Sequence, residues 1–157
     1  MVILNDFSTS VRRALSEIDS NYEDYDGLVV CGTHNQQNVP ELLDIIKLAR
    51  ENNTPTLLIC AGHQLGAIEY AQNVLGITDA TSEEFGEGTL VVRKRPHMKV
   101  GLHDGESWWS NYEVDPLIEE QWIKPTNWIA VPFHPEYQSS TLKPHPLLVE
   151  FIQKCKK

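Results

Sequence analysis

Three short apolar runs, each followed by a segment with helical spacing, organise the first half of the chain. The runs cover residues 2–4, 27–31 and 56–60, and short unbroken runs suit strands that are covered on both faces of a sheet. The segments that follow them place apolar residues three or four positions apart: Val11, Ala14, Leu15 and Ile18; Leu42, Leu43, Ile45, Ile46 and Ala49; Leu65, Ile68, Ala71 and Leu75. This alternation predicts a parallel sheet joined by right-handed helical crossovers.

Polar and turn residues mark the ends of the predicted helices. Pro40 stands near the start of the second helix, and Asn52 follows its last apolar residue. Gly76 is expected to end the third helix, whose polar side we place at Glu69 and Asn73. The first helix is expected to take its cap from one of five polar residues: Asn5, Asp6, Ser8, Thr9 or Ser10.

The second half of the chain follows another pattern. Residues 89–95 and 100–103 alternate and predict a β-hairpin with Pro96 and His97 near its turn. Residues 104–105 form a further turn, and 105–116 are expected to be a loop rich in aromatic residues, with at least one ring of Trp108 and Trp109 partly buried. Residues 128–133 predict a last buried strand, and the apolar residues after Pro146 predict a closing helix.

Together these elements predict an α/β fold, a three-layer sandwich with a mostly parallel central sheet plus a small antiparallel hairpin region. A chain of 157 residues fits one hydrophobic core, and we expect a single domain over residues 1–157. Sites in such sheets lie outside the carboxyl ends of the strands, so Gly32 and Cys60 should face one cleft.

Charge and cysteine content narrow the class of protein. The 13 Lys and Arg residues against 22 Asp and Glu residues give a formal charge of −9, and without a basic stripe we expect no nucleic-acid partner. No apolar run approaches a membrane span, so no membrane association is predicted. The three cysteines form no CxxC pair, which predicts free thiols in the cytoplasm.

Cys60 stands where a nucleophile would be most exposed. It follows the third apolar run, and Ala61 and Gly62 leave room only for a tight elbow before the next helix. Such an elbow lifts a side chain clear of the sheet and points the first backbone N–H groups of the helix at it. Those amides favour the reactive thiolate. The alternative is a buried cysteine with a purely structural role. The other residues of the site must distinguish these two roles of Cys60.

A thiolate nucleophile needs a base, and the base needs a partner that orients it. His134 and Glu136 supply both at the end of the last predicted strand, where residues two apart face the same side. The order Cys60, His134, Glu136 therefore makes a candidate catalytic triad.

The other histidines are weaker candidates for the catalytic base. His34 and His63 are placed to line the cleft but have no carboxylate two residues away, and three others fall in predicted turns and are expected in solvent: His97, His103 and His145. No histidine pair has the spacing of a zinc site on one helix. We predict neither a metal nor another cofactor.

Two segments carry a family resemblance: ICAGHQLGAIEYAQNVLGITDATSEEF, which contains Cys60, and PFHPEYQSSTLKPHPLLVEFI, which contains His134 and Glu136. The sequence resembles the class I glutamine amidotransferases, most of all the C-terminal glutaminase domain of CTP synthases, over most of residues 26–152. The resemblance implies the flavodoxin-like fold of that class.

The resemblance also implies roles. Cys60 would attack the side-chain amide of glutamine, His134 would shuttle the proton, and Glu136 would orient His134. An oxyanion hole and a substrate pocket would be formed by a further set of residues: Gly32, Thr33 and Ala61 for the oxyanion, and Gln64, Glu84, Trp109 and Ser110 for the substrate amino acid.

The resulting hypothesis is a glutaminase that forms a γ-glutamyl thioester on Cys60 and passes ammonia to a separate synthase subunit. One alternative is a stand-alone hydrolase or transferase of another γ-glutamyl amide, with Trp108 or Trp109 contacting the rest of the substrate. A second is a non-catalytic regulatory or binding subunit, because Leu58 and Thr33 stand where the family usually has glycine. The hypothesis leaves a homodimer open.

Overall fold

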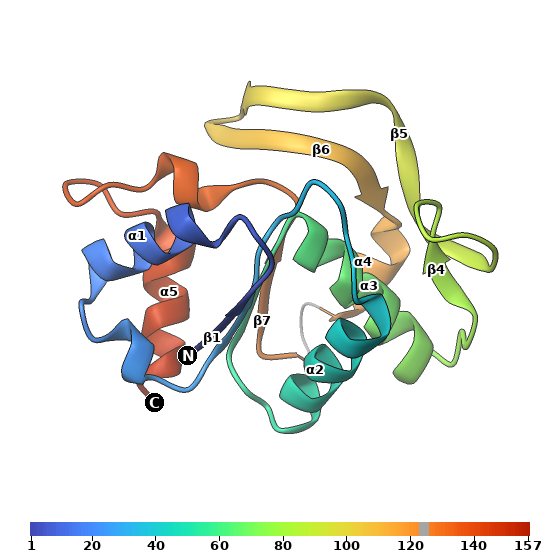
Figure 1. Cartoon of the computed structure of the whole chain (residues 1–157), viewed down its shortest axis with the longest axis horizontal. Helices are drawn as coiled ribbons and strands as arrows, with labels where there is room; N and C mark the ends of the chain where they lie inside the picture. Colours follow the sequence, from blue (N-terminus) through green and yellow to red (C-terminus); the bar gives the residue numbers. More distant parts are fainter. Residues whose placement is uncertain (123–125) are drawn as a thin grey trace.

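The computed structural model describes residues 1–122 and 126–157 (Figure 1). The elements follow one another in this order: β1 Val2–Leu4, α1 Ser8–Ile18, β2 Leu28–Val30, α2 Val39–Glu51, β3 Thr56–Ile59, α3 Ala61–Asn73, β4 Ala80–Ser82, β5 Thr89–His103, β6 Glu106–Val114, α4 Pro116–Trp122, β7 Trp128–Val131 and α5 Pro146–Cys155. Short 3₁₀ turns cover Tyr22–Asp24 and Pro135–Gln138.

The central sheet has four strands, all parallel, in the order β1-β2-β3-β7. Helices α1 and α5 lie on one face and α2 and α3 on the other (Figure 1). Successive strand residues alternate between these two layers: Val29 packs with α1 and α5, whereas Val30 packs with α2 and α3. This confirms the predicted three-layer α/β sandwich.

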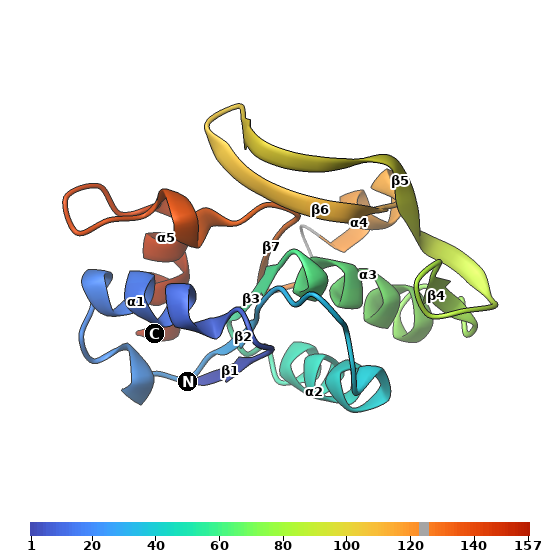
Figure 2. The same ribbon diagram turned by 45° about the horizontal axis from the view of Figure 1, so that its top comes forward.

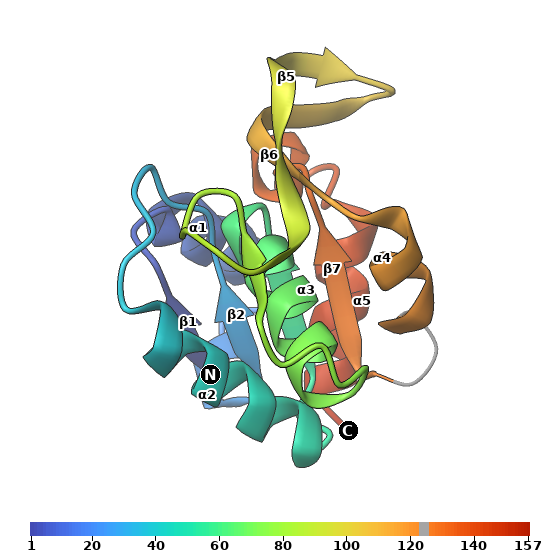
Figure 3. The same ribbon diagram turned by 90° about the vertical axis from the view of Figure 1, so that its right-hand side faces the viewer.

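A second sheet, β4-β5-β6, stands apart from the first. Its strands β5 and β6 form a long ribbon that arches over the carboxyl end of the central sheet and the start of α3 (Figure 2), and rises clear of the rest of the molecule in the side view (Figure 3). The ribbon therefore covers the edge where the sequence places the site.

The predicted turn of this hairpin was wrong. Pro96 and His97 lie inside β5, and the tight turn is formed by Asp104 and Gly105, whose φ angles are +53° and +80°. The pairing of β5 with β6 shifts by three residues between Lys94 and Lys99. Pro96 lacks a backbone N–H and falls in this bulge, so it interrupts the ladder without ending the strand.

The expected aromatic loop was also wrong, because residues 106–114 form β6. Its residues alternate in exposure, and the strand is recognisable only once the Asp104-Gly105 turn is identified. Trp108 is partly buried, as expected for one ring of the pair, and Trp109 is exposed. Strand β4 and helix α4 were not predicted.

Helix α3 is more deeply buried than its sequence suggests. Every residue from Ala61 to Ala71 is buried, because the central sheet, α2, α4 and all three strands of the second sheet contact this helix. Glu69, which we expected on a solvent side, is fully buried and bound twice by Arg50, with Nε–Oε2 and Nη2–Oε1 distances of 2.9 and 2.8 Å.

The ends of the other helices follow the sequence in part. Asn52 closes α2 as predicted, but Phe7 stands at the cap position of α1, where no side chain caps the helix. Within residues 1–122 and 126–157, none of the helices has the length and apolar character that crossing a bilayer requires.

Candidate active site

Cys60 lies in a sharp elbow between β3 and α3. Its φ and ψ are +52° and −102°, a strained conformation for a residue other than glycine. The elbow requires Gly62, because a Cβ at that position would lie 2.2 Å from the carbonyl oxygen of Val30. Helix α3 begins at Ala61 directly after Cys60, and the first amides of a helix have no acceptor within it. The predicted nucleophile elbow is present.

His134 and Glu136 form a buried pair behind the elbow. His134 Nδ1 lies 2.8 Å from Glu136 Oε1, and the side chains are 1% and 0% exposed. The pair forms for a different reason than predicted: β7 ends at Val131, and the 3₁₀ turn over Pro135–Gln138, not strand alternation, returns the carboxylate to the ring.

The backbone around this pair is fixed from two sides. The N–H of His134 donates to Ser107 O on β6 at 2.7 Å, and Arg13 on α1 donates to Glu136 O at 3.1 Å. The ring of Tyr137 stacks on that of His134 with 5.2 Å between centroids. These contacts hold the backbone of the pair and one face of the His134 ring.

The pair also determines where the proton sits on His134. A carboxylate only accepts hydrogen bonds, so Nδ1 carries the hydrogen that Glu136 receives. Nε2 is buried and has no hydrogen-bond partner among the described residues. Burial of the ring lowers its pKa, but the neighbouring Cys60 and Glu136 stabilise the charged ring, outweigh this effect and raise the pKa of His134 to about 9.

Gly32, which follows β2, lies against both Cys60 and His134. A Cβ on Gly32 would lie 3.0 Å from His134 Cε1 and 3.7 Å from Cys60 Cβ, so the end of β2 abuts both side chains. The Cys60 thiol also donates to Trp109 O on β6 at 3.4 Å. Cys60 is thereby enclosed by β2, β6 and the His134 loop, which confirms that Gly32 and Cys60 face one cleft.

A small cavity of about 80 Å³ opens at the thiol. Five predicted site residues line it beside Cys60, namely Thr33, Ala61, Gln64, Glu84 and Trp109. His34 lines it too, as the sequence predicted, and four further residues were not predicted: Phe7, Gln36, Asn111 and Tyr112. Asn111 follows from strand alternation two residues after Trp109 once β6 is known, whereas nothing in the sequence singles out Phe7.

Ser110 faces away from this cavity. Its hydroxyl is 2% exposed, donates to Tyr112 O at 2.7 Å and accepts from Arg95 Nε at 3.3 Å. A direct contact of the Ser110 side chain with substrate therefore has no geometric support. Glu84 borders the cavity, and partial burial raises the pKa of its carboxyl.

Two histidines outside the triad are paired with carboxylates. His63 Nε2 lies 2.6 Å from Glu119 Oε1 on α4, a partner distant in sequence. His145 was predicted to be in solvent, which is wrong: it is 8% exposed, and its Nε2 lies 2.9 Å from both carboxylate oxygens of Glu106. Long-range partners of this kind have no sequence signal. In the part of the chain that the structure describes, no three His, Cys, Asp or Glu residues gather as a metal site would need.

Comparison with known proteins decides the family. The family model for "Glutamine amidotransferase class-I" matches residues 3–126. The chain belongs to the class I glutamine amidotransferase family. This confirms the resemblance recognised in the sequence.

Similar proteins agree with this assignment. Two CTP synthases, from Methanoculleus marisnigri and Methanoregula boonei, are 32% and 30% identical over 85% of this chain, and the aligned regions make up 34% and 35% of their lengths. The chain thus spans about a third of the curated relatives it matches. A solved structure, the glutaminase domain of Trypanosoma brucei CTPS with bound acivicin, superposes with a TM-score of 0.78 at 21% identity, covering 97% of this chain and 89% of that one, and so supports the fold.

The amidotransferase accommodates the two departures from the family sequence. Leu58 is fully buried, and Gly66 on α3 makes room for it: a Cβ on Gly66 would lie 2.6 Å from Leu58 Cδ1. Neither Gly32 nor Thr33 has a positive φ, so threonine at the end of β2 causes no backbone strain. Neither substitution closes the site.

Proposed function

We propose that this chain is a cysteine-dependent glutaminase, in which Cys60, His134 and Glu136 form the catalytic triad. One arrangement supports the proposal: a thiol on a strained elbow lies close to a buried histidine. Glu136 orients this histidine, and its Nε2 has no hydrogen-bond partner in the described chain. Cys60 lines a cavity together with Gln64 and Glu84.

The chemistry follows from the protonation of His134. At neutral pH the raised pKa of His134 favours the ion pair in which Nε2 carries the proton of the Cys60 thiol, and the thiolate sulfur attacks the amide carbon of glutamine. Glu136 stabilises the imidazolium that forms. The N–H of Ala61, at the start of α3, is placed to donate to the oxyanion; removing a donor of this kind typically costs about 3 kcal/mol.

The tetrahedral intermediate then collapses. The carbon–nitrogen bond breaks, the departing NH2 group takes the proton from His134 and leaves as ammonia, and a γ-glutamyl thioester remains on Cys60. Water attacks the thioester, His134 accepts its proton, and glutamate and the free thiol are released. Glu84 and Gln64 both line the cavity, where Glu84 would hold the α-ammonium group of the substrate and Gln64 would contact the substrate amino acid.

Ammonia would be passed to a separate synthase partner. Two observations support this: similarity to CTP synthases, and the fact that the matched regions make up only about a third of those proteins. We place the protein in the cytoplasm because its three cysteines are free, including the buried Cys31 and Cys155.

Treatment with acivicin tests the triad and its pocket, because an electrophilic glutamine analogue must be recognised before it reacts with the thiolate. We expect one adduct by intact mass at neutral pH, located on Cys60 and absent from Cys60→Ala. Burial raises the pKa of Cys31 to about 12 and of Cys155 to about 11, so these thiols should stay unmodified.

Two variants sharpen the test. Glu136→Gln should slow adduct formation by about 10²–10⁴-fold, because it removes the charge that supports the imidazolium. Iodoacetamide, which needs no pocket, serves as the control reagent. Equal reaction of acivicin with wild type and Glu136→Gln, or an adduct elsewhere than Cys60, would refute the assignment of the triad.

A further inference from the structure

A second cavity adjoins the thiol pocket and is about 510 Å³ in volume. Thr33 and His34 line both cavities, so the two meet at the loop after β2. The remaining walls come from the end of β1, the loop before α2 and the first turns of α2: Leu4, Asn5, Asp6, Asn35, Gln37, Asn38, Glu41, Leu42 and Ile45. We call this space the side cavity.

The side cavity is far larger than glutamine hydrolysis requires. The leaving group of glutamine is a single nitrogen, and the thiol pocket already measures about 80 Å³. The second space beside the nucleophile is about six times as large and is open to solvent. The side cavity has room for an amine that carries several further carbon atoms.

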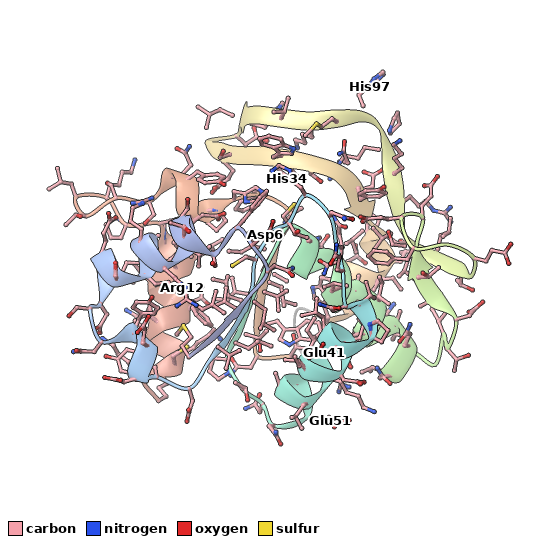
Figure 4. All side chains as sticks on the ribbon, in the orientation of Figure 1. Asp6, Arg12, His34, Glu41, Glu51 and His97 are labelled. Carbon is pink, nitrogen blue, oxygen red and sulfur yellow. The ribbon has the colours of Figure 1, made fainter. Side chains whose placement is uncertain are left out.

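Its walls indicate the charge of that amine. Asp6 and Glu41 contribute two carboxylates, and the lining includes no Lys or Arg. Within residues 1–122 and 126–157, neither carboxylate takes part in an ion pair; every salt bridge there joins other residues. Figure 4 places Asp6 and His34 near each other at the carboxyl edge of the sheet, with Glu41 on α2.

The other walls suit an aliphatic chain. Leu4, Leu42 and Ile45 supply apolar contacts, and four amide side chains supply neutral polar ones. A chain of methylene groups ending in an ammonium group matches this arrangement, with the methylenes against the apolar residues and the charge at Asp6 and Glu41.

We propose that the side cavity receives the amine half of a γ-glutamyl amide whose amine carries a second, positively charged nitrogen. This inference rests on the proposed thioester chemistry at Cys60, of which glutamine is the smallest substrate. The sulfur–carbon bond forms, the amide carbon–nitrogen bond breaks, and the departing diamine takes the proton held by His134. Water then hydrolyses the thioester to glutamate.

Two synthetic amides test the inference: the γ-glutamyl amide of 1,4-diaminobutane and that of pentylamine, in which a methyl group replaces the terminal ammonium. Release of the amine is followed in single-turnover reactions. We expect the wild type to acylate about threefold to tenfold faster with the charged amide, and the preference to shrink as salt screens the carboxylates, because partly exposed ion pairs contribute modestly.

Variants locate the preference. The pair Asp6→Asn and Glu41→Gln should bring the ratio of the two rates close to one. Glu51→Gln makes the same change of charge at the other end of α2, away from Asp6 and His34 (Figure 4), and should leave the ratio as in the wild type.

The outcomes separate the two proposals. No reaction of Cys60 with glutamine, acivicin or either amide would refute the thioester chemistry, and the inference with it. Reaction with glutamine or acivicin but with neither larger amide would refute the side cavity alone. Equal rates for the two amides, or a preference that survives Asp6→Asn and Glu41→Gln, would also overturn it.

Discussion

Glu136 is fully buried two residues after His134, and the structure holds the two side chains in one hydrogen bond. Burial lowers the pKa of His134, but Cys60 and Glu136 together stabilise the charged form of the ring. The folded pKa of His134, about 9, therefore lies above its unfolded value of 6.5. Because of this difference, the free energy of unfolding depends on the protonation of His134.

The sign of that dependence follows from the raised pKa. The contribution of His134 is fully present below pH 6.5 and is lost as pH rises through about 9, and it amounts to about 3 kcal/mol in the free energy of unfolding. Urea unfolding of wild type and His134→Asn at pH 6 and pH 10 measures it. We expect the wild type to lose about 3 kcal/mol more than the variant over this interval; equal losses would contradict the raised pKa.

The sequence singled out Cys60, His134 and Glu136 as a candidate triad but did not predict the geometry that joins them. Cys60 was recognisable because its elbow is a local pattern of apolar strand, small residues and helix. The contact of His134 with Ser107, the pairing of His145 with Glu106 and the cavity wall at Phe7 each join residues that are distant in sequence. Only the folded chain brings such residues together.

At the scale of elements, α3 is tightly packed against the central sheet. Gly62 and Gly66 both lie where a Cβ would collide with the neighbouring strand layer, the first with a backbone oxygen of Val30 and the second with a side-chain carbon of Leu58. The sequence correctly predicted the central strands and their helices, since their apolar patterns are strong. The sequence did not predict that α3 is buried on all sides, because this burial depends on contacts with β4, α4 and the ribbon.

The contact between Gly66 and Leu58 gives a test of this packing. Gly66→Ala should lower the free energy of unfolding by about 1–3 kcal/mol, because the new methyl group would lie 2.6 Å from Leu58 Cδ1. In a Leu58→Ala background the methyl group has room, and we expect most of that cost to disappear. Denaturant unfolding of the wild type, the two single variants and the double variant gives the coupling free energy between the two positions. If the losses in stability were additive, the two residues would not collide.

At the scale of the whole molecule, the ribbon of β5 and β6 ties the site to the C-terminal part of the chain. Along β6, Glu106 binds His145 at the start of α5, Ser107 O accepts from the N–H of His134, and Trp109 O accepts from Cys60. The sequence could not predict this arrangement, because the segment read as a loop. The position of the ribbon depends on contacts made across the molecule.

We therefore expect Glu106→Ala to loosen the ribbon over the site. Acivicin should react with Cys60 several-fold more slowly, and amide hydrogen exchange should rise along β6. Glu113→Ala is the matched control, since Glu113 lies on the same strand but pairs with Arg95, 3.2 Å away, near the other end of the ribbon. If both variants changed the reactivity of Cys60 equally, the His145 contact would have no special role.

The bulge in β5 is a place where related sequences can gain or lose residues. Residues 95–98 take up the three extra positions of β5, while β6 runs without interruption past Cys60 and His134. The length of the chain can therefore change in the bulge while Trp109 keeps its position over the thiol. Insertions and deletions should be tolerated there, and a single residue gained or lost within β6 would turn its whole inner face outward.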